Sequence, residues 1–362
     1  MDDKLKIKNL KLIASYQDEL YVNPRLKFLF FELTDKCNLH CKHCGSNCTS
    51  ANQNQLSFDS VKKVLDDVTK HLDVNEIMVC LTGGEPMLHP DVYKIIYYAK
   101  QLGFAVGMNT NGTLINSNTA VKLVDSGIDT ISISIDGLEA EHDLFRGLSG
   151  SYKKAMNWID ILKKVGVEPE IVTVVHKNNI HQLNDLYKIF KKVPIYQWRL
   201  INIEPIGRAN QTELFLNKEE YTKLFRFIEN KRLTLNNPID ISYGCSHFLG
   251  YDKELELRDF YFQCIAGIRV ASIASNGDII ACLDIERRAD LVQGNIYKDS
   301  FSDIWINKFK EFRHNKAIES KICKNCKFMN VCRGDSFHTW DFDRKEPKLC
   351  LSEKLEGEWY EK

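Results

Sequence analysis

The chain has 362 residues, of which 44% are hydrophobic and 27% charged, and its 49 basic residues balance 49 acidic ones. This composition is typical of a globular protein of about two domains, and a net charge of zero gives no bulk attraction to nucleic acid or to an anionic membrane. The first twenty residues mix charged and apolar side chains, which argues against a signal peptide, and no apolar run is long enough to span a membrane. The twelve cysteines therefore predict metal centres in a reducing compartment, and we expect a cytoplasmic protein.

Between residues 27 and 230, short apolar runs alternate with segments of helical periodicity. Six runs predict strands, at residues 28–33, 77–81, 104–108, 131–135, 171–175 and 198–203. The segments between them place apolar residues on one helical face, and Ser57 is a plausible cap for the first helix. This alternation predicts parallel strands joined by right-handed crossovers, and hence an α/β sheet or partial barrel.

Three thiols follow the first predicted strand: Cys37, Cys41 and Cys44, with three residues and then two between them. This spacing lets one loop direct three soft thiolates to one point, which suits an iron–sulfur cluster better than a hard cation. One iron of a cubane would then have no protein ligand and could bind a small molecule. A zinc knuckle or scattered thiols is the alternative interpretation.

Polar residues lie just beyond the carboxyl ends of the next strands. Gly83-Gly84-Glu85-Pro86 follows the second, Asn109 the third, and Ser134 and Asp136 end the fourth. Parallel sheets and barrels place ligand sites at this edge, so we expect these residues to converge on one pocket. The two glycines would let backbone approach a ligand, and their carbonyls can accept hydrogen bonds from an ammonium. A turn or a strand-end cap is the alternative for each feature.

Beyond residue 230 the alternation stops in the sequence and the thiols return. Residues 272–280 predict a hairpin with its turn at Asn276-Gly277, which could bring Cys264 and Cys282 to one metal. Four further thiols have the close spacing of a complete tetrathiolate site: Cys323, Cys326, Cys332 and Cys350. Structural zinc is the alternative occupant of that site.

The Cys-x3-Cys-x2-Cys loop after a strand resembles the radical SAM superfamily, and the resemblance extends along nearly the whole chain. It implies a [4Fe-4S] cluster whose open iron binds S-adenosylmethionine and cleaves it to a 5′-deoxyadenosyl radical. It also implies that Gly83-Gly84-Glu85-Pro86 holds the methionyl amino group, that Ser134 lies near the ribose or the methionyl carboxylate, and that Arg146 pairs with that carboxylate. Asn109 and Asp136 are further candidates for binding this cofactor.

The carboxyl-terminal thiols are similar to those of the SPASM domain, which typically binds two auxiliary iron–sulfur clusters. The four closely spaced thiols match one complete ligand set. Cys264 and Cys282 match ligands of the other cluster and Cys245 is an upstream candidate, but Ser336 stands where the pattern has a cysteine. The resemblance therefore implies one or two auxiliary clusters. Asp284, close after Cys282, is a candidate general base.

Three other features are left with more than one interpretation. The segment 204–209, which follows the sixth predicted strand, resembles one seen in relatives with extra clusters. Its Gly207-Arg208 pair could contact substrate or shape the exit of the barrel, and the sequence does not separate these roles. His176 and Cys80 stand apart from the motifs, and we expect both to be structural.

These interpretations predict an amino-terminal extension over residues 1–25, a partial (β/α)6 radical SAM barrel over 26–232 and an α+β SPASM domain over 233–362. The predicted reaction is abstraction of hydrogen from a peptide side chain or backbone, in the maturation of a ribosomally made precursor by cross-linking, oxidation or epimerisation. The predicted partners are that peptide and an electron donor such as flavodoxin or ferredoxin, with no nucleic acid and no membrane. Sulfatase-maturase-like formylglycine formation and dehydrogenation of a small metabolite are alternatives within the enzyme class, and a zinc-binding interaction scaffold is the alternative outside it.

Overall fold

The computed structural model describes residues 3–244, 247–250 and 253–352, so Cys245 lies outside the described residues. Its main sheet is a curved one in the spatial order β10-β9-β8-β1-β2-β3-β4-β5-β6-β7. The strands are β1 (Phe28–Glu32), β2 (Met78–Thr82), β3 (Ala105–Thr110), β4 (Thr130–Ser134), β5 (Glu170–Val175), β6 (Gln197–Asn202), β7 (Asp240–Tyr243), β8 (Val270–Ile273), β9 (Asp278–Ile280) and β10 (Gly294–Asn295). The neighbouring pairs from β1 to β7 are all parallel.

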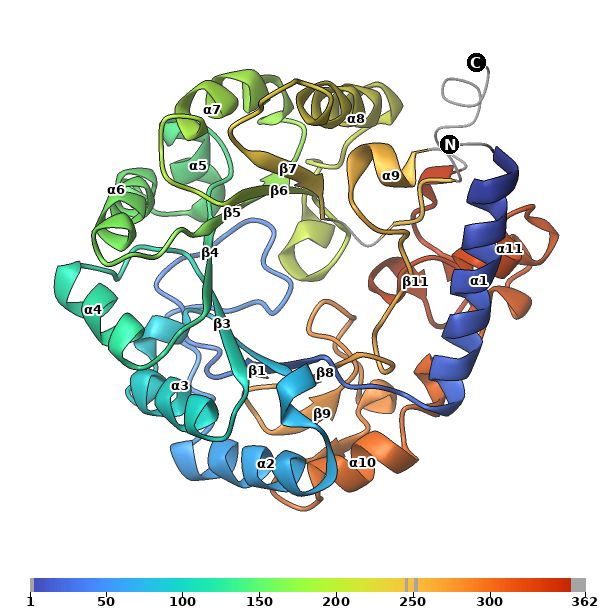
Figure 1. Ribbon diagram of the computed structural model, residues 1–362, viewed down its shortest axis with the longest axis horizontal. Helices are drawn as coiled ribbons and strands as arrows, with labels where there is room; N and C mark the ends of the chain where they lie inside the picture. Colours follow the sequence, from blue (N-terminus) through green and yellow to red (C-terminus); the bar gives the residue numbers. More distant parts are fainter. Residues whose placement is uncertain (1–2, 245–246, 251–252, 353–362) are drawn as a thin grey trace.

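Helices cover the outer face of this sheet (Figure 1). The helices of the barrel region are α2 (Phe58–His71), α3 (Val92–Gln101), α4 (Ser117–Asp125), α5 (Glu139–Arg146), α6 (Ser151–Lys164), α7 (Leu183–Phe190) and α8 (Lys218–Arg232). In α2, for example, Val61, Val64, Leu65 and Val68 are buried, because residues three and four apart share one helix face. The predicted cap is confirmed: the Ser57 side chain accepts a hydrogen bond from the Ser60 N–H at 3.1 Å.

The six predicted strands and the partial parallel barrel are confirmed, with strand bounds that shift by a residue or two. The expectation that the βα alternation stops at residue 230 is wrong, because β7 follows α8 and pairs in parallel with β6. The sequence did not reveal β7 because it spans only Asp240–Tyr243 and contains few apolar residues. The alternation therefore continues for one strand more than the sequence suggested.

The predicted hairpin is also confirmed, and it joins the barrel's own sheet. β8 and β9 are antiparallel, and Gly277 in the turn between them has a φ of +89°, which favours glycine. β8 in turn pairs in parallel with β1, from Phe28↔Val270 to Phe31↔Ile273. The sheet is thus continuous from the barrel into the segment that contains the carboxyl-terminal thiols.

The amino-terminal segment forms helix α1 (Asp3–Val22), which lies beside the short helix α11 (Met329–Cys332) (Figure 1). Leu10 and Ala14 of α1 are buried in a cluster with Phe328 and Val331. The guanidinium of Arg333 donates to the Asp18 carboxylate and to the Ala14 carbonyl, both at 2.6 Å. The amino-terminal helix therefore supports the region of Cys332 although the two are far apart in sequence.

The remaining described helices are α9 (Glu254–Leu257) and α10 (Phe301–Asn307), and a two-stranded sheet pairs β11 (Trp340–Asp341) with β12 (Glu346–Pro347). α10 packs on α2, where the Asp67 carboxylate accepts a hydrogen bond from the Ser302 N–H at 2.8 Å. None of the helices within the described ranges is both long and apolar enough to cross a membrane.

Candidate functional site

The three thiols of the first motif lie in a loop that follows β1. Cys37 and Cys41 are buried and Cys44 is half-buried. Hydrogen-bond donors surround the sulfurs: the Leu39 N–H lies 3.4 Å from the Sγ of Cys37, and Nη1 of Arg146 lies 3.7 Å from the Sγ of Cys41. Donors of this kind stabilise thiolate sulfurs and tune the potential of an iron–sulfur cluster.

The two glycines after β2 let their backbone touch the cysteine loop. A β-carbon on Gly83 would lie 2.4 Å from the carbonyl oxygen of Thr34, and one on Gly84 would lie 2.2 Å from that of Lys36. The Gly84 N–H donates to the Thr34 carbonyl at 2.6 Å, and the Glu85 N–H donates to the Lys36 carbonyl at 3.0 Å. The glycines thus serve close backbone packing against the loop, a role that the sequence did not indicate.

Gly207 and Arg208, whose role the sequence left open, clamp the cysteine loop. Nε of Arg208 donates to the Cys41 carbonyl at 2.8 Å, and Nη1 donates to the Cys48 carbonyl at 3.1 Å. Gly207 has a φ of +54°, and a β-carbon there would lie 2.4 Å from the carbonyl oxygen of Cys44. These contacts fix the loop between two strand ends that are distant in sequence.

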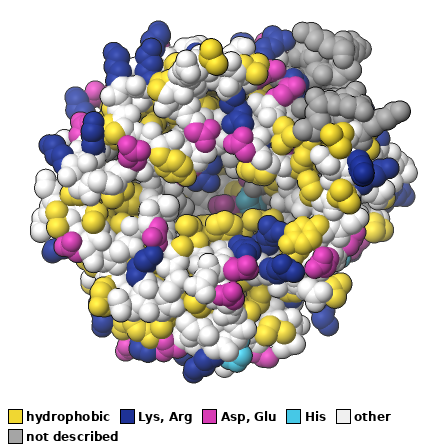
Figure 2. All heavy atoms as spheres, in the orientation of Figure 1, with side chains coloured by type: hydrophobic (Ala, Val, Ile, Leu, Met, Phe, Trp, Pro, Cys, Tyr) yellow, Lys and Arg dark blue, Asp and Glu magenta, His cyan; other side chains and the backbone are white. Residues whose placement is uncertain are grey.

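A cavity of about 450 Å³ opens over the loop, in the hollow in the middle of the face that Figure 2 shows. The sequence-predicted site residues in its lining are Cys37, Cys41, Cys44, Gly83, Gly84, Asn109, Ser134, Arg146, Cys282 and Asp284. Glu85, Pro86 and Asp136 are buried and are not among its lining residues. The strand ends therefore converge on one cavity, as the parallel topology predicts.

Glu85 and Asp136 instead lie behind the cavity wall, where each pairs with other residues of the wall. The Glu85 carboxylate accepts from the Thr110 hydroxyl at 2.7 Å and from the Asn111 N–H at 2.9 Å. Asp136 forms a buried ion pair with Nε of Arg146. Burial opposes ionisation of Asp136, but the Arg146 guanidinium, two nearby histidines and the Val174 N–H together outweigh burial and lower its pKa. Both carboxylates therefore have a structural role directly behind the cavity.

The thiols of the loop fit an iron–sulfur cluster chemically. Burial raises the pKa of Cys37 to about 12 and also raises that of Cys41, although Arg146 opposes the change at Cys41. The Cys48 thiol, whose nearness the sequence did not indicate, lowers the pKa of Cys44 through a hydrogen bond. Metal binding therefore releases protons here, and the loop offers three soft ligands beside a polar cavity.

The carboxyl-terminal quartet is formed by a short 3₁₀ turn (Cys323–Asn325), by α11 and by Cys350 after β12. Burial raises the pKa of Cys332 well above its usual value, and Asp335, Cys350 and Cys323 act in the same direction. The Phe328 N–H lies 3.4 Å from the Sγ of Cys326. Cys323 and Cys350 thus lie near Cys332, and a tetrathiolate site made by the quartet stays a prediction.

Cys264 and Cys282 have different surroundings. Cys264 packs with Cys332 against the cluster that contains Leu10 of α1. The Sγ of Cys282 lies 3.4 Å from Nε2 of His338. Nδ1 of His338 in turn lies 3.5 Å from the Glu204 carboxylate.

Sequence reasoning did not identify His338 or His247, because isolated histidines carry no spacing signal. Glu204 belongs to the segment 204–209 that follows the sixth predicted strand, and it lines the cavity. The other oxygen of Glu204 lies 3.1 Å from Nε2 of His247, whose Nδ1 lies 2.9 Å from Asp335. Burial would raise the pKa of Glu204, but hydrogen bonds from the two histidines outweigh it and lower the pKa to about 2. Burial likewise opposes the charge on His247, and Asp335 and Glu204 raise its pKa to about 9.

His176 is a structural residue, as expected. Its ring is fully buried and stacks on Phe145 with centroids 4.1 Å apart, and Phe145 stacks on His43 on its other side. Cys80 is buried within β2 and contributes to no described cavity.

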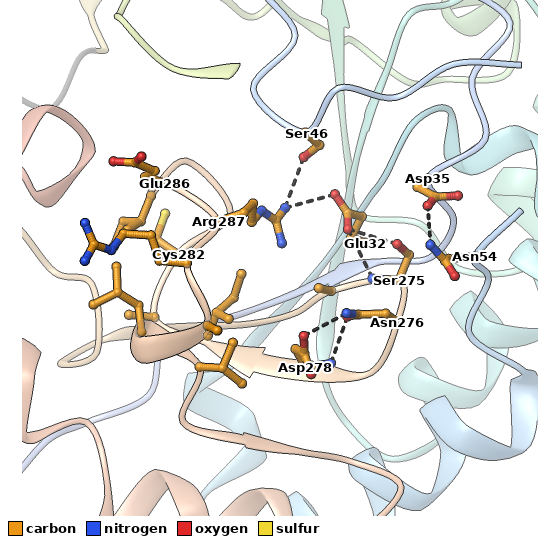
Figure 3. A pocket seen from close by; sticks show the side chains of 18 of the residues that line it. Glu32, Asp35, Ser46, Asn54, Ser275, Asn276, Asp278, Cys282, Glu286 and Arg287 are labelled. Atoms are coloured by element: carbon orange, nitrogen blue, oxygen red, sulfur yellow. Dashed lines mark hydrogen bonds and ion pairs between the residues drawn. The ribbon is translucent and has the colours of Figure 1, made fainter. Parts of the chain in front are cut away.

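A second cavity of about 360 Å³ adjoins the first and shares Glu32, Ser46 and Cys282 with it. Figure 3 shows Arg287 between Ser46 and Glu32, and the guanidinium lies 3.1 Å and 3.0 Å from them. Apart from Ser275 and Cys282, the rest of the labelled lining is acidic or amide-bearing: Asp35, Asn54, Asn276, Asp278 and Glu286. Together the two cavities form one region in which these polar groups lie beside apolar side chains.

Residues 31–190 match the family model of the radical SAM superfamily, and residues 264–327 match that of the SPASM iron–sulfur cluster-binding domain. The chain is 30% identical to the AdoMet-dependent heme synthase of Oleidesulfovibrio alaskensis, over 86% of this chain and 83% of that protein. It is 28% identical to the mycofactocin maturase MftC of Mycolicibacterium smegmatis, over 84% of this chain and 76% of that protein.

Two solved structures share the fold. Streptococcus suis SuiB bound to S-adenosylmethionine has a TM-score of 0.75 at 18% identity, covering 92% of this chain and 78% of that one. The protein anSMEcpe with bound AdoMet and the Kp18Cys peptide has a TM-score of 0.72 at 22% identity, covering 92% of this chain and 95% of that one. At these identities the likeness establishes the fold alone.

Proposed function

The chain belongs to the radical SAM superfamily and carries a SPASM domain, and on that premise we propose that Cys37, Cys41 and Cys44 hold its catalytic cluster. A radical SAM enzyme of this kind uses a [4Fe-4S] cluster with S-adenosylmethionine and one or two auxiliary clusters. When both are bound, the [4Fe-4S] cluster and S-adenosylmethionine supply a 5′-deoxyadenosyl radical that removes hydrogen from an unactivated carbon. We propose the quartet Cys323, Cys326, Cys332 and Cys350 as the ligands of an auxiliary cluster.

The chain's own residues bind and orient the cofactor and the substrate. The Gly83 and Gly84 backbone faces the cavity beside the thiols, where its carbonyls can accept from the methionyl ammonium. Ser134 and Asn109 line the same wall and can donate to the ribose or the carboxylate. Arg146 reaches the cavity edge beside Cys41, and its pairing with Asp136 fixes its orientation.

Glu85 and Pro86 support this binding wall from behind, since both are buried outside the cavity. Asp284 is exposed at the cavity rim, where its carboxylate can serve either as a proton acceptor for a substrate or as a ligand of a cation. A ferredoxin or flavodoxin is the proposed electron donor, because a reductively cleaved sulfonium requires a low-potential electron.

We propose a peptide as the substrate. The observation that supports this proposal is the pairing of the charged side chains in the cavity lining. Each arginine in the lining of the two cavities donates to a partner within the protein: Arg146, Arg199, Arg208, Arg287 and Arg288. The cavities also contain the carboxylates of Glu32, Asp278 and Glu286. Two of these acids are paired as well, Glu32 with Arg287 and Glu286 with Lys348. A neutral peptide segment suits such a region, because its amides can bond to the polar groups of the rim without requiring a free charge.

The similarity to proteins named AdoMet-dependent heme synthase favours a second candidate, a tetrapyrrole. Tetrapyrrole carboxylates would require cations that are free to pair with them. Each arginine of the described cavities donates to at least one group of the protein, although Nε of Arg199 is buried without a partner. This candidate therefore has less support from the charges of the site.

The test uses the full chain, purified without oxygen and with its clusters reconstituted. We would add reductant, S-adenosylmethionine and the peptide encoded by a short reading frame beside the gene, with Fe-coproporphyrin III in a parallel reaction. We expect 5′-deoxyadenosine and a mass change in the peptide only. A mass change in the porphyrin with an unaltered peptide would overturn the substrate assignment, and Cys44→Ala is the control that must abolish 5′-deoxyadenosine formation.

A further inference from the structure

Three side chains of different chemistry gather at the rim of the radical cavity. Cys282 follows β9, Asp284 lies two residues later, and His338 belongs to a 3₁₀ turn (Phe337–Thr339). One ligand atom from each lies within 4.8 Å of the others, and all three residues line the cavity that contains Cys37, Cys41 and Cys44. A thiolate, an imidazole and a carboxylate at such separations can bind one metal ion.

The close surroundings of Cys282 differ from a set of thiols. Within the described ranges, the ligand atoms grouped with its sulfur come from an imidazole and a carboxylate. Ser336 stands where the pattern has a cysteine, is fully buried, and accepts a hydrogen bond from the His338 N–H at 3.0 Å. Ser336 thus caps the turn that presents His338.

Buried groups behind His338 fix its orientation. The Glu204 carboxylate lies 3.5 Å from Nδ1 of His338, which leaves Nε2 directed at Cys282. His247 lies 3.1 Å from the other oxygen of Glu204 and pairs through its Nδ1 with Asp335, and both residues are buried. Carboxylates that hold the remote nitrogen of a histidine in this way are typical of metal-binding histidines.

The charges of this group also call for a cation. The group contains three carboxylates, those of Asp284, Glu204 and Asp335, and the charged imidazole of His247 balances one of them. A divalent ion between Cys282, Asp284 and His338 would balance the others. Among first-row metals, zinc takes thiolate, imidazole and carboxylate ligands together in tetrahedral sites.

We propose that Cys282, Asp284 and His338 bind one zinc ion, with Glu204 as the positioning residue behind His338. The three ligands leave a fourth tetrahedral position, which faces the cavity and can take water or a donor atom of a substrate. The site therefore replaces the first auxiliary cluster of the SPASM pattern and brings a Lewis acid to the radical cavity.

The first experiment measures metal content in the full chain with its iron–sulfur clusters reconstituted and with zinc chloride added and then dialysed. We expect one zinc per chain in the parent and in the control His314→Gln, whose imidazole is at the surface away from the site. Asp284→Asn, His338→Gln and Cys282→Ser should each lose the zinc and keep the parent's iron. Glu204→Gln should weaken zinc binding about 10- to 100-fold.

Cobalt substitution provides a second readout. Cobalt(II) added in place of zinc should give a thiolate-to-metal charge-transfer band in the parent that is absent in Cys282→Ser. Since Asp284 is exposed, Asp284→Asn decides the question if the His338 variant does not fold. Loss of zinc from Asp284→Asn identifies a ligand, whereas full zinc with slower peptide turnover would identify a base and overturn the proposal. Loss of about four irons from Cys282→Ser would also overturn it, since it would identify a cubane ligand.

Discussion

Gly84 illustrates how a single residue determines the geometry of the catalytic loop. A β-carbon there would lie 2.2 Å from the Lys36 carbonyl oxygen and 2.9 Å from the β-carbon of Cys37. Neither neighbour is the flexible end of a side chain, so the backbone of the cysteine loop would have to move. The glycine is therefore required for the position of the first thiol, in addition to any contact with a cofactor.

We predict that Gly84→Ala destabilises the protein by about 2 kcal/mol and lowers the occupancy of the first cluster, because the added methyl overpacks the loop. Iron analysis and denaturant unfolding would measure both effects. Gly45→Ala is the matched control within the same loop, since its β-carbon would meet only Ile206 at 3.4 Å. Equal iron content in the two variants would contradict this role for Gly84.

His247 links the stability of the protein to pH. Burial alone would lower its pKa, but Asp335 and Glu204 raise it to about 9, above the ordinary value of 6.5. A raised pKa in the folded state means that the charged imidazole stabilises the fold. That contribution is complete below pH 6.5 and is lost as the pH rises through about 9.

We therefore predict that the parent loses on the order of 3 kcal/mol of stability from this group between about pH 6.5 and pH 9. Denaturant unfolding at a series of pH values would measure the change. His247→Gln, which cannot titrate, should lack this component. The same pH dependence in both proteins would show that His247 is not its source.

At the scale of elements, the docking of α1 beside α11 connects the amino terminus to the quartet of thiols. Leu10 is 3% exposed and packs in the cluster with Phe328, just before α11, and with Val331 of α11, the residue before Cys332. Leu12, on the same helix, is 59% exposed. An alanine substitution changes helix propensity equally at both leucines but removes packing only at Leu10, so comparing the two variants isolates the effect of packing.

We predict that Leu10→Ala costs about 3 kcal/mol and reduces iron at the quartet, because it leaves a cavity beside the segment that carries Cys332. Leu12→Ala should change the free energy of unfolding by less than about 0.5 kcal/mol. Iron analysis together with thermal unfolding would measure the difference. A quartet fully loaded with iron in Leu10→Ala would show that α1 packing does not support it.

The sheet is the second element that joins distant segments. β8 pairs in parallel with β1, so the hairpin before Cys282 lies next to the strand before Cys37 in one sheet. This pairing brings Cys282, Asp284 and His338 to the cavity of the first cluster. A radical site and a second metal site can therefore act on the same substrate.

For the whole molecule, the two complete ligand sets predict the total metal content. We expect about eight irons in the parent and about four in the triple variant Cys37→Ala, Cys41→Ala, Cys44→Ala, because each cubane contains four. The triple variant should also form no 5′-deoxyadenosine, while zinc at Cys282 should be unchanged. About twelve irons in the parent would show that a third cubane occupies the region of Cys282.

The sequence by itself determined the superfamily and the parallel barrel and predicted the thiols of two clusters, because these depend on local spacing and on short-range periodicity. It could not separate the roles of Gly207 and Arg208, and it gave no sign of the group formed by Glu204, His247 and His338. Those contacts join residues more than forty positions apart in the chain. Only the tertiary structure brings such residues together, since isolated polar side chains acquire a role only from the neighbours that the fold gives them.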